Sequence, residues 1–150
     1  MFYPSGLKPG DTIRVVAPAA YNCSDEWERC RELLCEWGYK VKAGSFVGSQ
    51  WGYLAGRDEE RARDLEAAFM DEECDAVLCL RGGYGTTRIL DLIDYDLIRR
   101  NAKLFIGFSD ITALHTVSDK RVIWLLYMVL WPYHWVEKAV ILHAKDLKTC

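Results

Sequence analysis

A serine and an aspartate stand side by side where a short apolar run of the sequence stops. The run lies in KLFIGFSDITALH, residues 103–115, and the pair is Ser109 and Asp110. This pattern predicts a buried strand, a tight turn and then a helix. A hydroxyl at such a turn projects from the edge of a sheet, near the N–H groups that begin the helix. A nucleophilic serine needs that exposure and those amide donors, which hold the oxyanion formed during attack.

The turn matches a nucleophile elbow only in part. In the G-x-S-x-G pattern, Gly107 supplies the first glycine, but Ile111 occupies the position of the second. Ser109 and Asp110 are also ordinary capping residues for a helix. Spacing alone leaves both interpretations open and favours the cap.

A glycine-rich turn, RGGYG at residues 81–85, follows a second apolar run. Glycines permit positive φ and a close approach of the backbone, so their N–H groups can face an anion. The spacing of Gly82, Gly83 and Gly85 matches neither the dinucleotide-binding fingerprint nor the Walker loop. A purely structural turn is therefore an equal alternative. Arg81, at the end of the expected strand, suits a carboxylate ligand.

Other polar residues are weaker candidates for chemistry. Asp11, Asp94 and Asp96 fit turns and helix caps better than acid catalysis. His115 follows Ser109 by about two helical turns. That separation is too long for a direct hydrogen bond, so we exclude His115 as the catalytic base.

The elements that must position these residues alternate between strand and helix. Apolar runs predict four strands, at residues 13–16, 39–44, 75–80 and 103–108. Helical periodicity predicts helices at 24–37 and 58–73, one or two short helices before residue 101, and another from Ser109. The expected caps are Ser24 or Asp25 for the first helix and Asp58 for the second.

This alternation predicts an α/β fold, with a mostly parallel sheet and helices on both faces. Residues 44–57 carry four glycines and are expected to form a loop. In parallel sheets, ligands bind at the carboxyl ends of the strands. The loops after Ala17, Leu80 and Phe108 should therefore converge on one edge.

The composition limits the possible functions. The chain has 150 residues, of which 51% are hydrophobic and 27% charged, with a net charge of −3. This balance is typical of a globular domain and argues against nucleic acid as a partner. Six cysteines without zinc-binding spacing, and no secretory signal, indicate a reducing cytoplasm. The most apolar segment, residues 122–136, is too short for a membrane span and contains a proline. We expect neither a metal nor a cofactor.

Three segments together resemble the N-terminal domain of the LD-carboxypeptidases. They are LKPGDTIRVVAPA (7–19), the stretch from GYLAGRDEERARDL to DYDLI (52–98) and KLFIGFSDITALH (103–115). These enzymes are serine peptidases of murein recycling, related to the microcin immunity hydrolases. The resemblance implies a flavodoxin-like domain, similar to that of class I glutamine amidotransferases. It also implies cleavage of an L–D amide bond, which releases terminal D-alanine from cytoplasmic muropeptides.

The resemblance also implies roles for individual residues. Ser109 corresponds to the nucleophile, and the backbone N–H groups of Asp110 and Gly83 to the oxyanion donors. The expected substrate-binding residues are Arg81, Gly82 and Tyr84, with Arg81 meeting the substrate carboxylate. Ala19 departs from the family, which often has a serine after the proline of the first loop.

The family's Glu and His complete its triad from a C-terminal domain, which this chain lacks. Without a base a serine hydroxyl is a poor nucleophile, so we expect little turnover from the chain alone. The expected organisation is a nucleophile domain at 1–117 and an aberrant tail at 118–150. The full-length form is expected to be a homodimer.

The tail carries a possible sign of a shifted reading frame. The codons for Tyr127–Trp131, regrouped from the third base of the tyrosine codon, permit His-Gly-Pro-Met, a motif that the family has after this domain. We hypothesise a frameshift near residues 116–119. The alternative is a genuine but divergent C-terminal helix, and the coding DNA decides between them.

Two other functions remain open. A related hydrolase could use the same Ser109 on peptidyl or acyl-sulfamoyl nucleotides. The chain could also be a non-catalytic fragment that binds a small anion, with Ser109 serving only as a cap.

Overall fold

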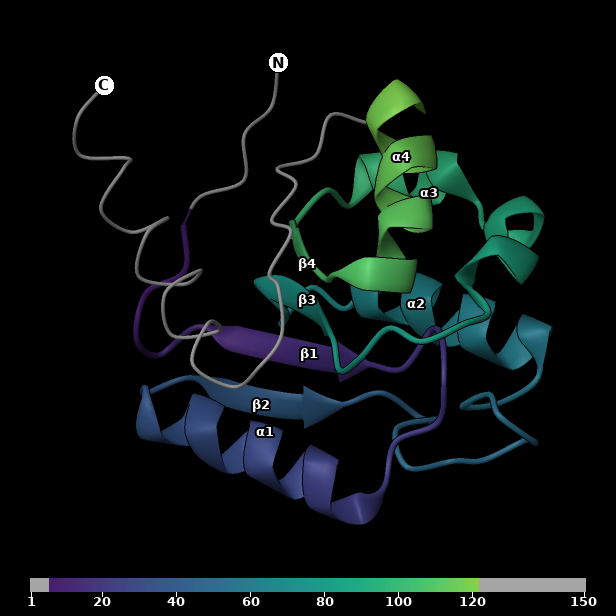
Figure 1. Cartoon of the computed structure of the whole chain (residues 1–150). Coiled ribbons are helices and arrows are strands. Elements are labelled where there is room, and N and C mark those ends of the chain that lie inside the picture. Colours follow the sequence, from purple (N-terminus) through teal and green to yellow (C-terminus); the bar gives the residue numbers. More distant parts are fainter. Residues whose placement is uncertain (1–5, 122–150) are drawn as a thin grey trace.

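Four parallel strands form the sheet at the centre of the protein (Figure 1). The computed structural model describes residues 6–121, with side chains as far as Val117. The strands are β1 (Thr12–Val16), β2 (Lys40–Ala43), β3 (Ala76–Cys79) and β4 (Leu104–Ile106), in the order β2-β1-β3-β4. This is the strand order of flavodoxin-like sheets, and it confirms the predicted α/β fold.

Helices cover both faces of this sheet. They are α1 (Ser24–Glu36), α2 (Asp58–Met70), α3 (Tyr95–Arg100) and α4 (Thr112–Arg121), with 3₁₀ turns η1 (Thr86–Arg88), η2 (Leu90–Leu92) and η3 (Ser109–Ile111). Figure 1 shows α1 on one face and α2, α3 and α4 on the other. The predicted segment of one or two short helices after the glycine turn is therefore two 3₁₀ turns and one α-helix.

The two faces have separate hydrophobic cores because side chains alternate along each strand. Val15 packs on the side of α1, whose Leu34 is buried beneath it. Val16, its neighbour in sequence, packs on the side of α2 with Leu65 and Phe69. Burying one such side chain contributes roughly 1.5–3 kcal/mol, so both layers stabilise the sheet.

The helices α1 and α2 begin where the sequence predicts, but their N-cap residues are not the predicted ones. The N-cap residues are Cys23 for α1 and Arg57 for α2, and their N–H groups donate to Glu26 and Glu60 at 3.2 and 2.7 Å. The predicted cap Asp58 is instead the first residue of α2. A glutamate three residues after the cap satisfies the cap's own N–H group, which leaves Asp58 available for other partners.

Two of the weaker polar candidates have the structural roles that the sequence suggested. The Asp94 carboxylate caps α3 by accepting from the N–H groups of Asp96 and Leu97, each at 2.9 Å. Asp11 accepts from the N–H of Lys8 at 2.9 Å across a turn. Neither carboxylate is therefore placed for chemistry.

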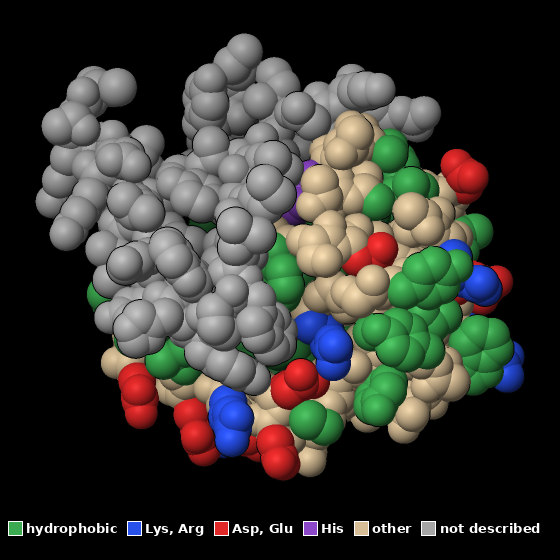
Figure 2. Space-filling view, in the orientation of Figure 1, with side chains coloured by type: hydrophobic (Ala, Val, Ile, Leu, Met, Phe, Trp, Pro, Cys, Tyr) green, Lys and Arg blue, Asp and Glu red, His purple; other side chains and the backbone are tan. Residues whose placement is uncertain are grey.

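Large hydrophobic side chains also remain on the surface. Figure 2 shows hydrophobic surface between charged side chains on the face that it presents. Among the described residues, the exposed large hydrophobics are Trp51, Tyr53, Met70, Tyr84 and Leu92. Trp51 and Tyr53 lie in the loop after β2, and Tyr84 lies in the loop after β3. Three exposed aromatic rings thus belong to loops that leave the carboxyl ends of strands.

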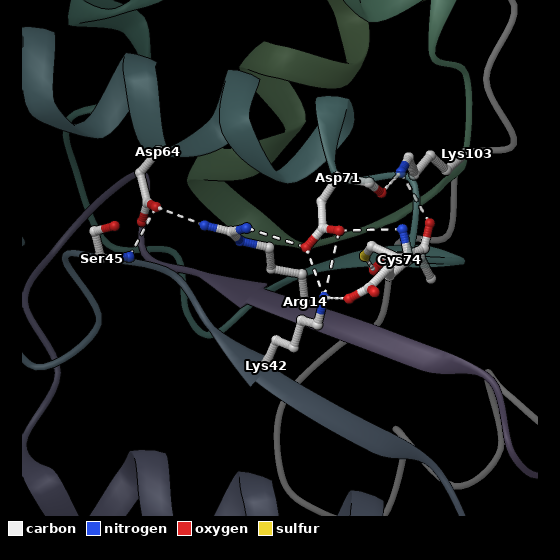
Figure 3. Close-up of polar contacts among 9 residues, drawn as sticks. Arg14, Lys42, Ser45, Asp64, Asp71, Cys74 and Lys103 are labelled. Atoms are coloured by element: carbon white, nitrogen blue, oxygen red, sulfur yellow. Dashed lines mark hydrogen bonds and ion pairs between the residues drawn. The ribbon is translucent and has the colours of Figure 1, made fainter.

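A network of charged side chains ties β1, β2 and α2 together (Figure 3). Arg14 lies between two carboxylates, with Asp71 at 3.2 Å and Asp64 at 3.8 Å. Lys42 also binds Asp71, at 3.1 Å. Lys103 donates to the carbonyl of Cys74 at 2.9 Å, just before β3. The contacts of Asp71 thus join the end of α2 to the middle of β1 and to β2, and the contact of Lys103 joins the chain before β4 to the chain before β3.

Candidate active site

The loops after β1, β3 and β4 meet at the carboxyl edge of the sheet, as the sequence predicts. The N–H of Ala20 donates to the carbonyl of Gly82 at 3.4 Å. The N–H of Thr86 donates to the Asp110 carboxylate at 2.9 Å. A Cβ atom placed on Gly82 would lie 3.1 Å from the Cβ of Ser109. The glycine turn and the serine turn are therefore in contact.

The loop after β2 joins the same edge, which the sequence pattern did not predict. The N–H of Ala55 donates to the carbonyl of Ala19 at 3.1 Å, and the N–H of Tyr21 to the carbonyl of Tyr53 at 3.0 Å. This pairing fixes the loop along residues 19–21. It brings the Tyr53 hydroxyl within 3.2 Å of the position that a Cβ on Gly83 would occupy.

Ser109 has a strained backbone at this edge. Its φ is +58°, and no other non-glycine residue among residues 6–121 has a positive φ. A left-handed backbone costs a non-glycine residue roughly 1–3 kcal/mol, and such strain concentrates at functional sites. Ser109 is also exposed; it lies three residues after the end of β4, at the first residue of η3. Exposure on a sharp strand-to-helix turn is the geometry of a nucleophile elbow.

The structure explains why Ile111 can replace the second glycine of the elbow pattern. The Ile111 side chain is fully buried, so it points into the core rather than toward the nucleophile. The first glycine is required because a Cβ on Gly107 would lie 2.4 Å from an Ile111 methyl group. Packing between these two residues sets the shape of the turn.

Asp110 uses its side chain for structure, and its backbone N–H lies at the site. Its carboxylate accepts from the N–H of Thr86, and its carbonyl accepts from the Thr86 hydroxyl at 2.5 Å. The Asp110 nitrogen is 3.2 Å from the Cβ position of Gly82. It belongs to the first turn of the helical segment that continues into α4, where N–H groups favour negative charge.

The glycine turn is too crowded for larger residues. Gly83 has a φ of +113°, and a Cβ there would lie 2.8 Å from the Cβ of Ala20. Gly83 is nevertheless exposed, so its backbone is accessible at the rim. This combination suits a backbone donor for a bound anion.

Arg81 already has partners at the rim. Its guanidinium lies 3.4 Å from the Glu26 carboxylate on α1 and 3.4 Å from the carbonyl of Tyr21. Its side chain is 31% exposed. A substrate carboxylate would have to share Arg81 with the Glu26 carboxylate or displace that carboxylate from it. Tyr84, the other predicted binding side chain at this turn, is exposed beside it.

The described histidine lies away from this edge. His115 is buried, and its ring centroid is 4.9 Å from that of Phe105 in β4. This core position agrees with its exclusion as the base. His134 and His143 lie outside the described residues.

The described part of the chain offers no metal cluster and no membrane span. Residues 6–121 contain no group of three or more His, Cys, Asp or Glu side chains that could hold a metal ion. In the same part of the chain, no helix has the length and hydropathy needed to cross a bilayer.

Sequence reasoning missed two residues that organise the edge. Thr86 is completely buried and holds Asp110 from two directions. Arg61 is buried on the inner face of α2 and donates to the carbonyls of Pro18, Gly56 and Gly85. The signal for Arg61 was its helical phase, because it lies four and seven residues before Leu65 and Ala68 of the core face.

Known proteins share this architecture. The sequence matches the family of the LD-carboxypeptidase N-terminal domain (Peptidase_S66) over residues 13–127. A probable murein peptide carboxypeptidase of Bacillus subtilis (strain 168) is 47% identical over 120 residues, which are 80% of this chain and 38% of that protein.

Solved structures agree. An MccF-like protein from Bacillus anthracis superposes with a TM-score of 0.73 at 33% identity, covering 79% of this chain and 38% of that one. The microcin C7 self-immunity protein MccF, in complex with aspartyl sulfamoyl adenosine, superposes with a TM-score of 0.72 at 29% identity, covering 76% of this chain and 35% of that one. The chain thus spans somewhat more than a third of the length of these relatives. It belongs to the LD-carboxypeptidase family and corresponds to the N-terminal domain of that family.

Proposed function

We propose that this chain is the nucleophile-bearing part of a serine LD-carboxypeptidase, which releases terminal D-alanine from muropeptides. The observation that carries the proposal is the exposed, left-handed Ser109 in contact with the glycine turn. A helix cap has no need of this strain, because the usual cap has an extended backbone.

The proposed reaction is acyl transfer through Ser109. Its Oγ attacks the carbonyl carbon of the L–D amide while its proton passes to a base. The oxyanion is held by the N–H groups of Asp110 and Gly83 until D-alanine leaves, taking a proton from the same base. Water then cleaves the acyl-serine by the same sequence of steps. Arg81, with Gly82 and Tyr84 beside it, is proposed to receive the carboxylate of the substrate.

The base is proposed to lie in the part of the family's length that this chain does not cover. His115 is buried in the core and unsuited to the task. We therefore propose that the 150-residue chain alone has little turnover. A boundary at Val117, with a frameshifted tail after it, remains part of the proposal; the family match runs to residue 127. Sequencing the coding DNA tests it, since the second frame must encode His-Gly-Pro-Met.

The setting of the proposed enzyme is the cytoplasm, with muropeptides or other small peptides as partners. Cys23 and Cys35 are free thiols on the surface, which suits a reducing compartment. The full-length form is proposed to be a homodimer. Nucleic acid and membrane are not proposed as partners.

The test uses an extended chain, in which residues 1–116 are joined to the C-terminal part of the Bacillus subtilis relative. This extended chain should release D-alanine from a muramoyl tetrapeptide, and the 150-residue chain should not. Release by the 150-residue chain at the rate of the extended chain would contradict the proposed need for a second part.

A second candidate function is hydrolysis of peptidyl or acyl-sulfamoyl nucleotides. It is favoured by the likeness to MccF and by the exposed rings of Trp51, Tyr53 and Tyr84, on which a base could stack. Offering aspartyl sulfamoyl adenosine and the tetrapeptide to the extended chain separates the two. A non-catalytic, anion-binding fragment is the third candidate, and labelling of Ser109 by a fluorophosphonate would exclude it.

A further inference from the structure

A single peptide group connects a buried arginine to the serine turn. The carbonyl of Gly85 accepts from Arg61 at 2.9 Å, and the N–H of Thr86 donates to the Asp110 carboxylate at 2.9 Å. These two atoms belong to the same peptide bond. Its positive N–H end therefore faces an anion and its negative C=O end faces a cation, and both charges stabilise one orientation of the peptide.

Arg61 is buried, and its guanidinium binds backbone carbonyls of the loops rather than solvent. Its side chain is completely buried, at the start of α2. Besides Gly85 it donates to the carbonyl of Gly56, at 3.2 Å, and to that of Pro18. It also pairs with Asp58. One guanidinium thus joins the loops after β1, β2 and β3, using donors in a rigid planar arrangement.

Asp58 extends this anchor beyond the glycine turn. Its carboxylate binds Arg88 of η1 at 2.7 Å as well as Arg61. Since η1 directly follows Gly85, the turn is held to the start of α2 at two points. The charge of the buried guanidinium is compensated by the same carboxylate.

We propose that Arg61 is a positioning residue for the oxyanion hole: it fixes the Gly85–Thr86 peptide, and through it the Asp110 turn and Gly83. The role in holding an oxyanion rests on the proposed function. The contact that fixes the Gly85–Thr86 peptide to Arg61, which we call the Arg61 clamp, does not depend on that function. Replacing Arg61 by Lys keeps the charge and loses the planar set of donors. The glycine turn then gains freedom, and the two amide donors lose their common geometry.

The experiment uses the 150-residue chain and two measurements. The first is amide hydrogen exchange at Thr86, relative to Leu80, whose N–H donates to Val16 within the sheet. The second is binding of N-acetyl-boroalanine, in which boron replaces the carbonyl carbon of the L-residue. Ser109 Oγ bonds to the trigonal boron while its proton passes to the buffer in the solvent, which gives a tetrahedral boronate anion visible by ¹¹B NMR. The adduct needs the oxyanion donors, and in alkaline buffer the solvent takes the proton that a catalytic base would otherwise accept.

Two controls separate positioning from general stability. Arg31→Lys makes the same change on the exposed surface of α1, where Arg31 pairs with Glu28. Leu34→Ala removes buried carbon from the opposite face of the sheet and lowers stability without touching the loops. Ser109→Ala shows which part of the boron signal comes from the serine.

Arg61→Lys should speed relative Thr86 exchange at least about tenfold and weaken the serine-dependent adduct at least about tenfold. Neither control should do so. Thr86 protection that survives Arg61→Lys would overturn the inference whatever the probe does, as would adduct weakening no larger than in Leu34→Ala. If the wild-type chain forms no adduct that Ser109→Ala abolishes, the proposed function fails instead, and Thr86 exchange still decides the clamp.

Discussion

Thr86 holds Asp110 from two directions. The Thr86 N–H donates to the Asp110 carboxylate at 2.9 Å, and the Thr86 hydroxyl donates to the Asp110 carbonyl at 2.5 Å. The residue after the candidate nucleophile is thus fixed by both its side chain and its backbone. Since its N–H is one of the two proposed oxyanion donors, this pair links the glycine turn to the chemistry of Ser109.

Thr86→Val keeps the shape of this buried side chain and removes its hydroxyl. The Asp110 carbonyl then loses its donor, which should lower the free energy of unfolding by about 1–3 kcal/mol. Urea unfolding measures the change. Thr87→Val is the matched control, because Thr87 is exposed and should tolerate the change with little effect. Equal losses of stability at the two positions would contradict a structural role for the hydrogen bond from the Thr86 hydroxyl to the Asp110 carbonyl.

Ser109→Gly should stabilise the protein relative to Ser109→Ala. Glycine adopts a φ of +58° without strain, whereas alanine retains the cost that serine has. We expect roughly 1 kcal/mol between the two variants in thermal or urea unfolding. An alanine variant as stable as the glycine variant would show that the backbone at this position is not left-handed.

Gly83→Ala should be more damaging than Gly48→Ala. Both glycines have positive φ, +113° and +85°, so both substitutions are strained. A Cβ at Gly83 also meets Ala20 at 2.8 Å, whereas a Cβ at Gly48 has nothing within 4 Å. The difference in unfolding free energy isolates the crowding at the rim, and we expect about 1–3 kcal/mol. Equal losses would place the glycine turn away from the loop after β1.

The Asp58→Asn variant should be less stable than the wild type only at pH values at which the wild-type Asp58 carboxylate is ionised. Hydrogen bonds from Arg88, joined by those from Arg61 and opposed by burial, lower the pKa of Asp58. In the unfolded chain an aspartate has a pKa of about 3.9. The lowered folded pKa therefore stabilises the protein above that pH, and this stability is lost as the pH falls through the folded value.

The difference in unfolding free energy between wild type and Asp58→Asn should thus be constant above about pH 5 and shrink below about pH 4. Urea unfolding from pH 2 to 7 measures it. Asp91→Asn, on exposed η2, is the control and should change little. A difference that persists or grows at pH 2 would contradict the role of the Asp58 charge.

The arrangement of elements was predictable because it depends on local patterns. The apolar runs at residues 13–16, 75–80 and 103–108 form β1, β3 and β4. A parallel sheet brings their carboxyl ends to one edge, so the sequence alone predicts that the glycine turn lies beside Ser109. The predicted starts of α1 and α2, at residues 24 and 58, are confirmed, but the predicted caps were wrong. The N-caps are Cys23 and Arg57, whose N–H groups are satisfied by Glu26 and Glu60 in the first turn.

The supports of the site could not be predicted in the same way. Arg61 and Gly85 are 24 residues apart, and their contact depends on how α2 packs against the sheet. The loop after β2 pairs with residues 19–21 through backbone atoms, which carry no sequence signal. The positive φ of Ser109 and the close approach of Gly107 to Ile111 likewise belong to the folded turn, and serine is not a residue type that indicates a left-handed backbone.

Release of D-alanine from a muramoyl tetrapeptide by the extended chain, compared with its Ser109→Ala variant, tests the central claim most directly. The account predicts that the variant loses activity by roughly a thousandfold or more, with its fold intact by circular dichroism. An alanine variant that releases D-alanine at the rate of the parent would contradict it, because the nucleophile would then have to be another group.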